Sequence, residues 1–123
     1  MTTNEIAGRL VSLCREGKFE IAQKELFAAD VISTEPYATP TFSKETRGLN
    51  ALLEKGQKFT GMIEEVHAIS VSDPLVAGNS FACALQLELT IKGHGRMALQ
   101  ELCVYEVKDG KIASEHFTSR FHV

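Results

Sequence analysis

Three features that would place a protein at a membrane, on nucleic acid or outside the cell are missing from this chain of 123 residues. It has no apolar run near the roughly 20 residues that a membrane-spanning helix needs, so we expect no membrane interaction. Lysine and arginine are scattered and the net charge is -3, so we expect no nucleic-acid partner. The N-terminal segment is polar and does not resemble a secretory signal peptide.

Cysteine is also scarce. Cys14, Cys83 and Cys103 form an odd set without metal-ligand spacing. We expect three reduced thiols, each packed as a small core residue, in a cytoplasmic protein. The sequence has no glycine-rich phosphate loop and no Ser-His-Asp signature. We therefore expect neither a cofactor nor a bound metal ion.

The composition is that of a folded domain, with 44% hydrophobic and 24% charged residues. No repeat, linker or low-complexity segment interrupts it. A chain of this length can bury a sizeable core without disulfides. We predict a single domain over residues 1–123.

The clearest pattern lies in residues 81–91, where apolar side chains occupy every second position. This period of two predicts a β-strand. Residues 96–107 and 112–120 predict two further strands. Glycine-rich turn residues at 92–95 and an Asp-Gly pair at 109–110 would join the three strands as antiparallel hairpins.

The N-terminal half is predicted to be mainly helical. Thr2 and Glu5 are spaced as a capping box that opens a helix, and Gly17 ends it. The other predicted elements are helices over residues 18–29 and 48–59, strands over 30–35 and 62–71, and a loop over 37–47. Helices followed by a run of strands predict an α+β domain, with three helices on one face of a curved antiparallel sheet that ends in a meander.

Three short segments accompany this order of elements: Phe27-Ala-Ala-Asp30, Glu35-Pro36 and Val107-Lys-Asp-Gly-Lys-Ile112. With them the chain resembles the nuclear-transport-factor-2-like (NTF2-like) superfamily, most closely its SnoaL-like branch, over essentially its whole length. The resemblance implies a cone-shaped fold with a cavity between the sheet and the helices, and a homodimer formed through the other sheet face. The superfamily hosts isomerases, dehydratases, cyclases and non-enzymatic binding proteins on one frame.

Side chains alternate between the two faces of a strand, so two-residue turns would sort the C-terminal strands into a polar and an apolar face. In this register Glu101 faces Gln86, and Cys103 faces His116. The predicted polar face holds Gln86, Glu88, Glu101, Cys103, Tyr105, His116 and Thr118. The predicted apolar face holds Phe81, Leu85, Leu87, Leu102, Val104 and Phe117. Cys83 and Cys103 would point to opposite faces and could not form a disulfide.

Two assignments of these faces stay open. The resemblance implies that the position of Cys103 points into the cavity, so that the polar face lines the cavity and a second copy covers the apolar face. The residues alone also allow the apolar face to pack on the helices and the polar face to meet water. A one-residue slip at either turn would rearrange both faces.

His116 and Glu101 form the first catalytic hypothesis. A carboxylate beside an imidazole holds the ring in one tautomer and can raise its pKa toward neutral pH. The alternative is that both residues lie on a solvated polar face.

Glu35 is the third catalytic candidate. Its place before Pro36 resembles that of the proton-shuttling acid of the superfamily's steroid isomerases, and a carboxyl group in an apolar cavity has a raised pKa. The rest of the isomerase pattern is not matched. The position of the oxyanion-stabilising acid falls at Cys103, and that of the first-helix tyrosine falls near Val11. The alternative is that Glu-Pro only ends a strand.

The proposed ligand is a small apolar organic molecule held by a few polar anchors. The candidate ligand-binding residues are Tyr37, Gln86, Glu88, Cys103, Tyr105 and Thr118. Three functions follow from the sequence: a binding protein without catalysis, a cofactor-free isomerase, dehydratase or cyclase that uses Glu35 or His116 as acid or base, and a dimeric interaction module.

Overall fold

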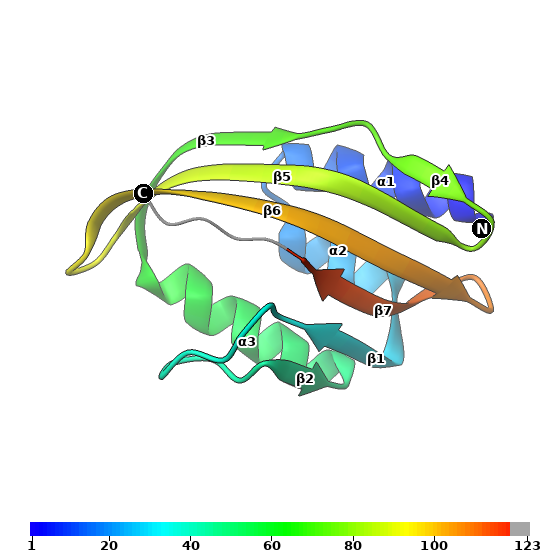
Figure 1. Ribbon diagram of the computed structural model, residues 1–123, viewed down its shortest axis with the longest axis horizontal. Coiled ribbons are helices and arrows are strands. Elements are labelled where there is room, and N and C mark those ends of the chain that lie inside the picture. The colour runs from blue at the N-terminus through cyan, green and yellow to red at the C-terminus, as the bar shows by residue number, and fades with distance from the viewer. Residues whose placement is uncertain (119–123) are drawn as a thin grey trace.

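A computed structural model describes residues 1–118 of the protein. Figure 1 shows helices covering one side of a curved sheet. The helices are α1 (Thr3–Arg15), α2 (Phe19–Leu26) and α3 (Leu49–Met62). The strands are β1 (Phe27–Thr34), β2 (Glu45–Arg47), β3 (Ile63–Val71), β4 (Leu75–Ala77), β5 (Ser80–Ile91), β6 (Gly95–Lys108) and β7 (Lys111–Phe117). Within the described part of the chain, no helix has the length and apolar character that crossing a membrane requires.

Helix α1 begins and ends as its sequence predicts. The Thr2 side chain accepts a hydrogen bond from the Glu5 amide, and the Glu5 carboxylate accepts one from the Thr2 amide, at 3.1 and 2.8 Å. These two bonds complete the predicted capping box. Gly17 follows the helix with a φ of +75°, which glycine adopts without steric cost. The apolar stripe that includes Ile6 and Leu10 is buried in the main core.

The sheet is mixed rather than purely antiparallel. Its strand order is β2-β1-β7-β6-β5-β3, with β4 paired to β5. Strand β1 runs parallel to β7, and the other neighbouring pairs are antiparallel. The meander and the helix order agree with the prediction, whereas the parallel closure of the first strand on the last corrects it.

The predicted second helix is too long, and the short strands β2 and β4 were not predicted. Residues 27–29 belong to β1, whose first residue, Phe27, pairs with Ile112 of β7. Strand β2 lies inside the predicted loop and pairs with the end of β1. Alanines at 28 and 29 fit a helix by local propensity, so long-range pairing decides their conformation.

The turn between β5 and β6 is longer than predicted, which shifts the register by one residue. Ile91 pairs with Gly95, so three residues, rather than two, form the turn. Gln86 pairs with Gln100 instead of Glu101. The same shift sets Cys83 directly opposite Cys103, with both side chains on the same face.

A β-bulge changes the second register. Val107 pairs with Ile112 as predicted, but the pairing shifts by one residue beyond this point. Tyr105 therefore lies opposite Glu115, and Cys103 lies opposite Phe117 instead of His116. An extra residue in one strand reverses the facing of everything after it.

These two shifts overturn the predicted faces. The helix-facing side holds Phe81, Leu85, Leu87 and Phe117 together with Glu101, Cys103 and Tyr105. The outer side holds Gln86, Glu88, Leu102, Val104, His116 and Thr118. Each face is thus a mixture of the two predicted sets, and neither open assignment is correct as a whole.

Candidate functional site

Within residues 1–118, three polar side chains are buried beneath the helices: Ser33 is 0%, Glu35 is 4% and Glu115 is 6% exposed. Ser33 and Glu35 belong to β1 and the residue after it, and Glu115 belongs to β7. The parallel pairing of these strands sets Ser33 beside Glu115. Burying a carboxyl group is costly unless a partner compensates, so the partners of both acids define the chemistry of the site.

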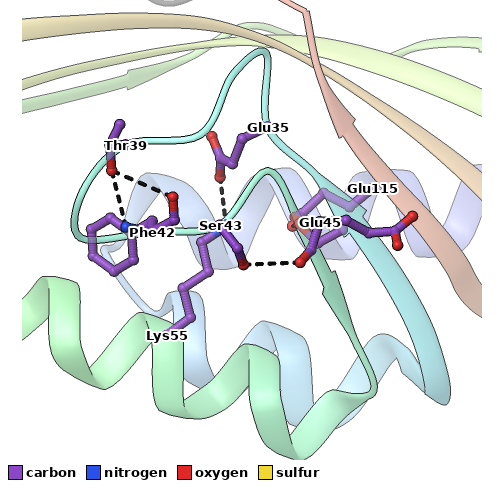
Figure 2. A network of polar contacts seen from close by, with 8 residues as sticks. Glu35, Thr39, Phe42, Ser43, Glu45, Lys55 and Glu115 are labelled. Atoms are coloured by element: carbon purple, nitrogen blue, oxygen red, sulfur yellow. Dashed lines mark hydrogen bonds and ion pairs between the residues drawn. The ribbon is translucent and has the colours of Figure 1, made fainter.

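Glu35 forms a short ion pair with Lys55. The Lys55 Nζ atom lies 2.6 Å from Glu35 Oε2, and the lysine side chain is 19% exposed. Figure 2 shows Lys55 reaching from α3 toward Glu35. This ammonium group balances the Glu35 charge in a place where water is largely excluded.

Glu115 has a neutral partner instead. The Ser33 hydroxyl donates a hydrogen bond of 2.8 Å to Glu115 Oε1. Burial raises the pKa of Glu115 to about 7, although the Ser33 hydrogen bond and the Lys55 charge both lower it. Nearby Glu35 and Glu101 raise this pKa further. Glu115 is therefore a carboxyl group that holds and releases a proton near neutral pH.

The tyrosine opposite Glu115 belongs to the apolar core. Tyr105 is 5% exposed and stacks on Phe81, with ring centroids 4.8 Å apart. A second ring, that of Phe27, meets it edge-on at 6.4 Å. Burial and the neighbouring Glu115 carboxyl raise the pKa of Tyr105, so its hydroxyl keeps its proton.

A surface hollow of about 300 Å³ adjoins the Lys55 side chain. The hollow is lined by Thr41, Phe42, Ser43, Thr46, Ala51, Glu54, Lys55 and Lys58. The Phe42 amide donates a hydrogen bond of 2.9 Å to the Thr39 side chain and holds the loop above the hollow (Figure 2). The Phe42 ring packs edge-on against Phe59. The hollow therefore lies between this loop and α3, with Lys55 separating it from Glu35.

The structure separates the predicted catalytic residues. Glu35 and Glu101 lie on the helix-facing side. His116 is exposed on the outer side, where it lines a second hollow of about 320 Å³ with Val104, Glu106, Ser114 and Thr118. The predicted pairings of His116 with Glu101 and with Cys103 are therefore wrong, because the bulge turns His116 outward.

The predicted ligand-binding residues divide in the same way. Cys103 and Tyr105 are buried on the helix-facing side. Gln86, Glu88 and Thr118 are exposed on the outer side. Tyr37 is 44% exposed in the loop that follows β1. One shared ligand could not contact both groups, since the sheet lies between them.

Sequence reasoning missed Ser33, Lys55 and Glu115. Lys55 had a signal, because it lies three residues after Leu52 and four before Phe59, within the inward stripe of a helix. A lysine at such a position indicates a buried partner. Glu115 had none, because its inward facing depends on the bulge. Within residues 1–118, no group of three or more His, Cys, Asp or Glu side chains is placed to hold a metal ion.

Comparison with known proteins agrees with this architecture. A model of the SnoaL-like domain matches residues 1–119. A candidate SnoaL-like polyketide cyclase from Mesorhizobium loti is 35% identical with a TM-score of 0.87, over 95% of this chain and 98% of that one. No curated protein matches the chain.

More distant structures share the fold. A protein of unknown function with a cystatin-like fold from Xanthomonas campestris is 22% identical with a TM-score of 0.78, over 100% of this chain and 92% of that one. A protein with a ketosteroid-isomerase-like fold from Catenulispora acidiphila, in complex with trimethylamine, is 18% identical with a TM-score of 0.70, over 92% and 83%. The chain belongs to the SnoaL-like domain family and has the fold of NTF2-like proteins.

Proposed function

We propose that this protein binds a small, mostly apolar organic molecule on the helix-facing side of its sheet and transfers a proton to or from it without a cofactor. The observation that carries the proposal is the pair of buried carboxyl groups with different partners. Glu35 has an ammonium group at 2.6 Å, and Glu115 has a serine hydroxyl at 2.8 Å. When two acids of one site lie in unlike environments, they can take different roles in proton transfer.

Glu115 is the proposed acid and base. A carboxylate in an apolar site removes a proton from carbon next to a carbonyl more readily than a solvated one does, because its basicity is higher. Glu35 and Glu101 are proposed to support it by electrostatics. The relationship to a candidate polyketide cyclase supports an enolisable carbonyl compound as the substrate class.

Hydrogen–deuterium exchange tests this function. The protein would be incubated in D₂O with simple 1,3-diketones, and exchange at the carbon between the carbonyl groups would be followed by NMR. We expect catalysed exchange that falls by about 10²–10⁴-fold in Glu115→Gln, the usual contribution of a positioned acid or base. Glu88→Gln, on the outer face, is the matched control and should exchange at the wild-type rate. Equal rates in all three proteins would reject Glu115 as the proton-transfer group.

Binding without catalysis is the second candidate. It is favoured by the hollow beside α3, which is lined by Phe42 and Lys55 but not by Glu115. A ligand held there would contact no proton-transfer acid. In the same NMR experiment, ligand signals that are broadened by the wild type but not by a Phe42 variant, without catalysed hydrogen–deuterium exchange, would support this function over the first.

We further propose that a second copy of the chain covers the outer face of the sheet. Leu102 is 43% exposed there, and Val104 lines the adjoining hollow. Leu102→Glu should raise the dimer dissociation constant by roughly 100-fold or more, because a symmetric interface would bury the added charge twice. Size-exclusion chromatography across a dilution series measures this, with Ser12→Glu on the exposed side of α1 as the control. A Leu102→Glu protein that stays dimeric at every concentration would place the interface elsewhere.

A further inference from the structure

Two thiols face each other on the central strands, and neither takes part in the proposed proton transfer. Cys83 of β5 and Cys103 of β6 are direct cross-strand partners. They are 6% and 1% exposed, on the helix-facing side of the sheet. The sequence-based expectation that they point to opposite faces is wrong, because the longer turn shifts the register by one residue.

We propose that Cys83 and Cys103 are an oxidation site, at which hydrogen peroxide converts the two thiols into an intramolecular disulfide. The sulfur of Cys83 attacks one peroxide oxygen, an S–O bond forms, and the O–O bond breaks. The released hydroxide takes the thiol proton and becomes water. Cys103 then attacks the Cys83 sulfur, the S–S bond forms, and hydroxide leaves with the Cys103 proton as a second water. Two thiols are oxidised and one peroxide is reduced.

The strand geometry sets the two residues directly opposite each other. The Val107 amide donates to the Asn79 carbonyl at 2.8 Å, which marks these two residues as a hydrogen-bonded pair. Such pairs recur every second residue, so Cys83 and Cys103 form another. Directly opposed residues of this kind have Cα atoms about 5.5 Å apart, inside the range that disulfides span. The Cβ atoms of a hydrogen-bonded pair lie near the upper end of roughly 4.5–5.5 Å, beyond the roughly 3.5–4.5 Å of a relaxed disulfide, so the bridge requires side-chain rotation and a local approach of the two strands.

The local environment decides which thiol reacts first. The adjacent Cys103 thiol lowers the pKa of Cys83, whereas Cys83 and burial both raise the pKa of Cys103. Cys83 is also the more exposed of the two thiols, at 6% against 1%, so it is the attacking group and Cys103 resolves the sulfenic acid. Burial raises the pKa of the third thiol, Cys14, to about 12, which keeps it protonated. Cys14 is near Cys83 and is the internal competitor in any test.

Peroxide treatment of the folded protein tests the proposal directly. After quenching, the protein would be denatured, alkylated with iodoacetamide and digested, and its peptides would be identified by mass spectrometry. We expect one linked pair, containing Cys83 and Cys103, and an alkylated Cys14. Cys14→Ser should give the same linked pair at an unchanged rate. Cys103→Ser should instead accumulate a sulfenic acid at Cys83 that dimedone labels.

Two results would overturn the proposal. One is three alkylated cysteines after peroxide treatment that fully oxidises a free dithiol control. The other is a bridge that joins Cys14 to Cys83. Both are read from the wild-type protein, so the test does not depend on any cysteine variant folding.

Discussion

Replacing Lys55 by methionine is expected to lower the free energy of unfolding by about 3 kcal/mol. Removing one partner of a buried ion pair leaves the other charge without compensation, at a typical cost of about 3–5 kcal/mol. We place the effect at the lower end because Lys55 is 19% exposed and Glu35 keeps a further interaction. Methionine retains most of the aliphatic length, so lost packing adds little. Urea denaturation near pH 7.5 measures the change.

Lys58→Met is the matched control for this prediction. Lys58 lies one turn further along α3 and is exposed, with its ammonium group 5.6 Å from the centre of the Phe42 ring. A contact of that kind is worth at most about 1 kcal/mol at an exposed site. The double variant Glu35→Leu with Lys55→Met should recover part of the loss, since no buried charge remains. If Lys55→Met costs no more than Lys58→Met, the ion pair contributes little to stability.

Glu115 is expected to make the protein less stable as the pH rises. Its pKa is about 7 in the folded protein and 4.5 when unperturbed, so the folded state binds its proton more tightly. This stabilising contribution is complete below pH 4.5 and is lost as the pH rises to about 7. At about 1.4 kcal/mol per pH unit, the expected loss across this window is about 3 kcal/mol.

The difference in unfolding free energy between the wild type and Glu115→Gln isolates this contribution. Glutamine keeps an oxygen that can accept the Ser33 hydrogen bond and has no proton to lose. The pKa values of Glu5, Glu16 and Glu25 are lowered by their partners, so their contributions to stability change with pH only below 4.5. These contributions are the same in both proteins and cancel when the unfolding free energies are subtracted. Urea denaturation at several pH values between 4.5 and 7.5 gives the curve. A difference between the two proteins that stays constant across this window would show that Glu115 titrates normally.

Local signals were enough to predict most of the fold. The capping box at Thr2, the turn glycine at Gly17 and the alternation in β5 each act within a few residues of where they are read, and the structure confirms all three. The short strand β2 carries no such signal, because its three residues are held by pairing with β1. Pairing between strands that are distant in the chain leaves no such local signal in the sequence.

The site was harder to predict because facing alternates with every residue. One extra residue in the bulge at 113 was sufficient to move His116 outward and Glu115 inward. One extra residue in the turn before Gly95 placed Gln86 and Glu88 on the face opposite to that of Glu101. Glu35 was a candidate because its place before Pro36 resembles that of the acid in the superfamily's steroid isomerases, and its buried position does not depend on either shift. Ser33 could not be predicted, because a serine in a strand gives no sign of a buried hydrogen bond until its neighbour in the sheet is known.

The parallel pairing of β1 with β7 has a consequence for how the site assembles. Ser33 and Glu115 are 82 residues apart in the chain, yet they share a hydrogen bond. During synthesis the acid leaves the ribosome only after every other strand of the sheet has been made. Contacts of such long range form late, because the chain entropy of closing the loop must be overcome first. The helices and the β5–β6 hairpin depend on more local contacts, so we expect the pairing of β1 with β7, and with it the buried acid pair, to form last.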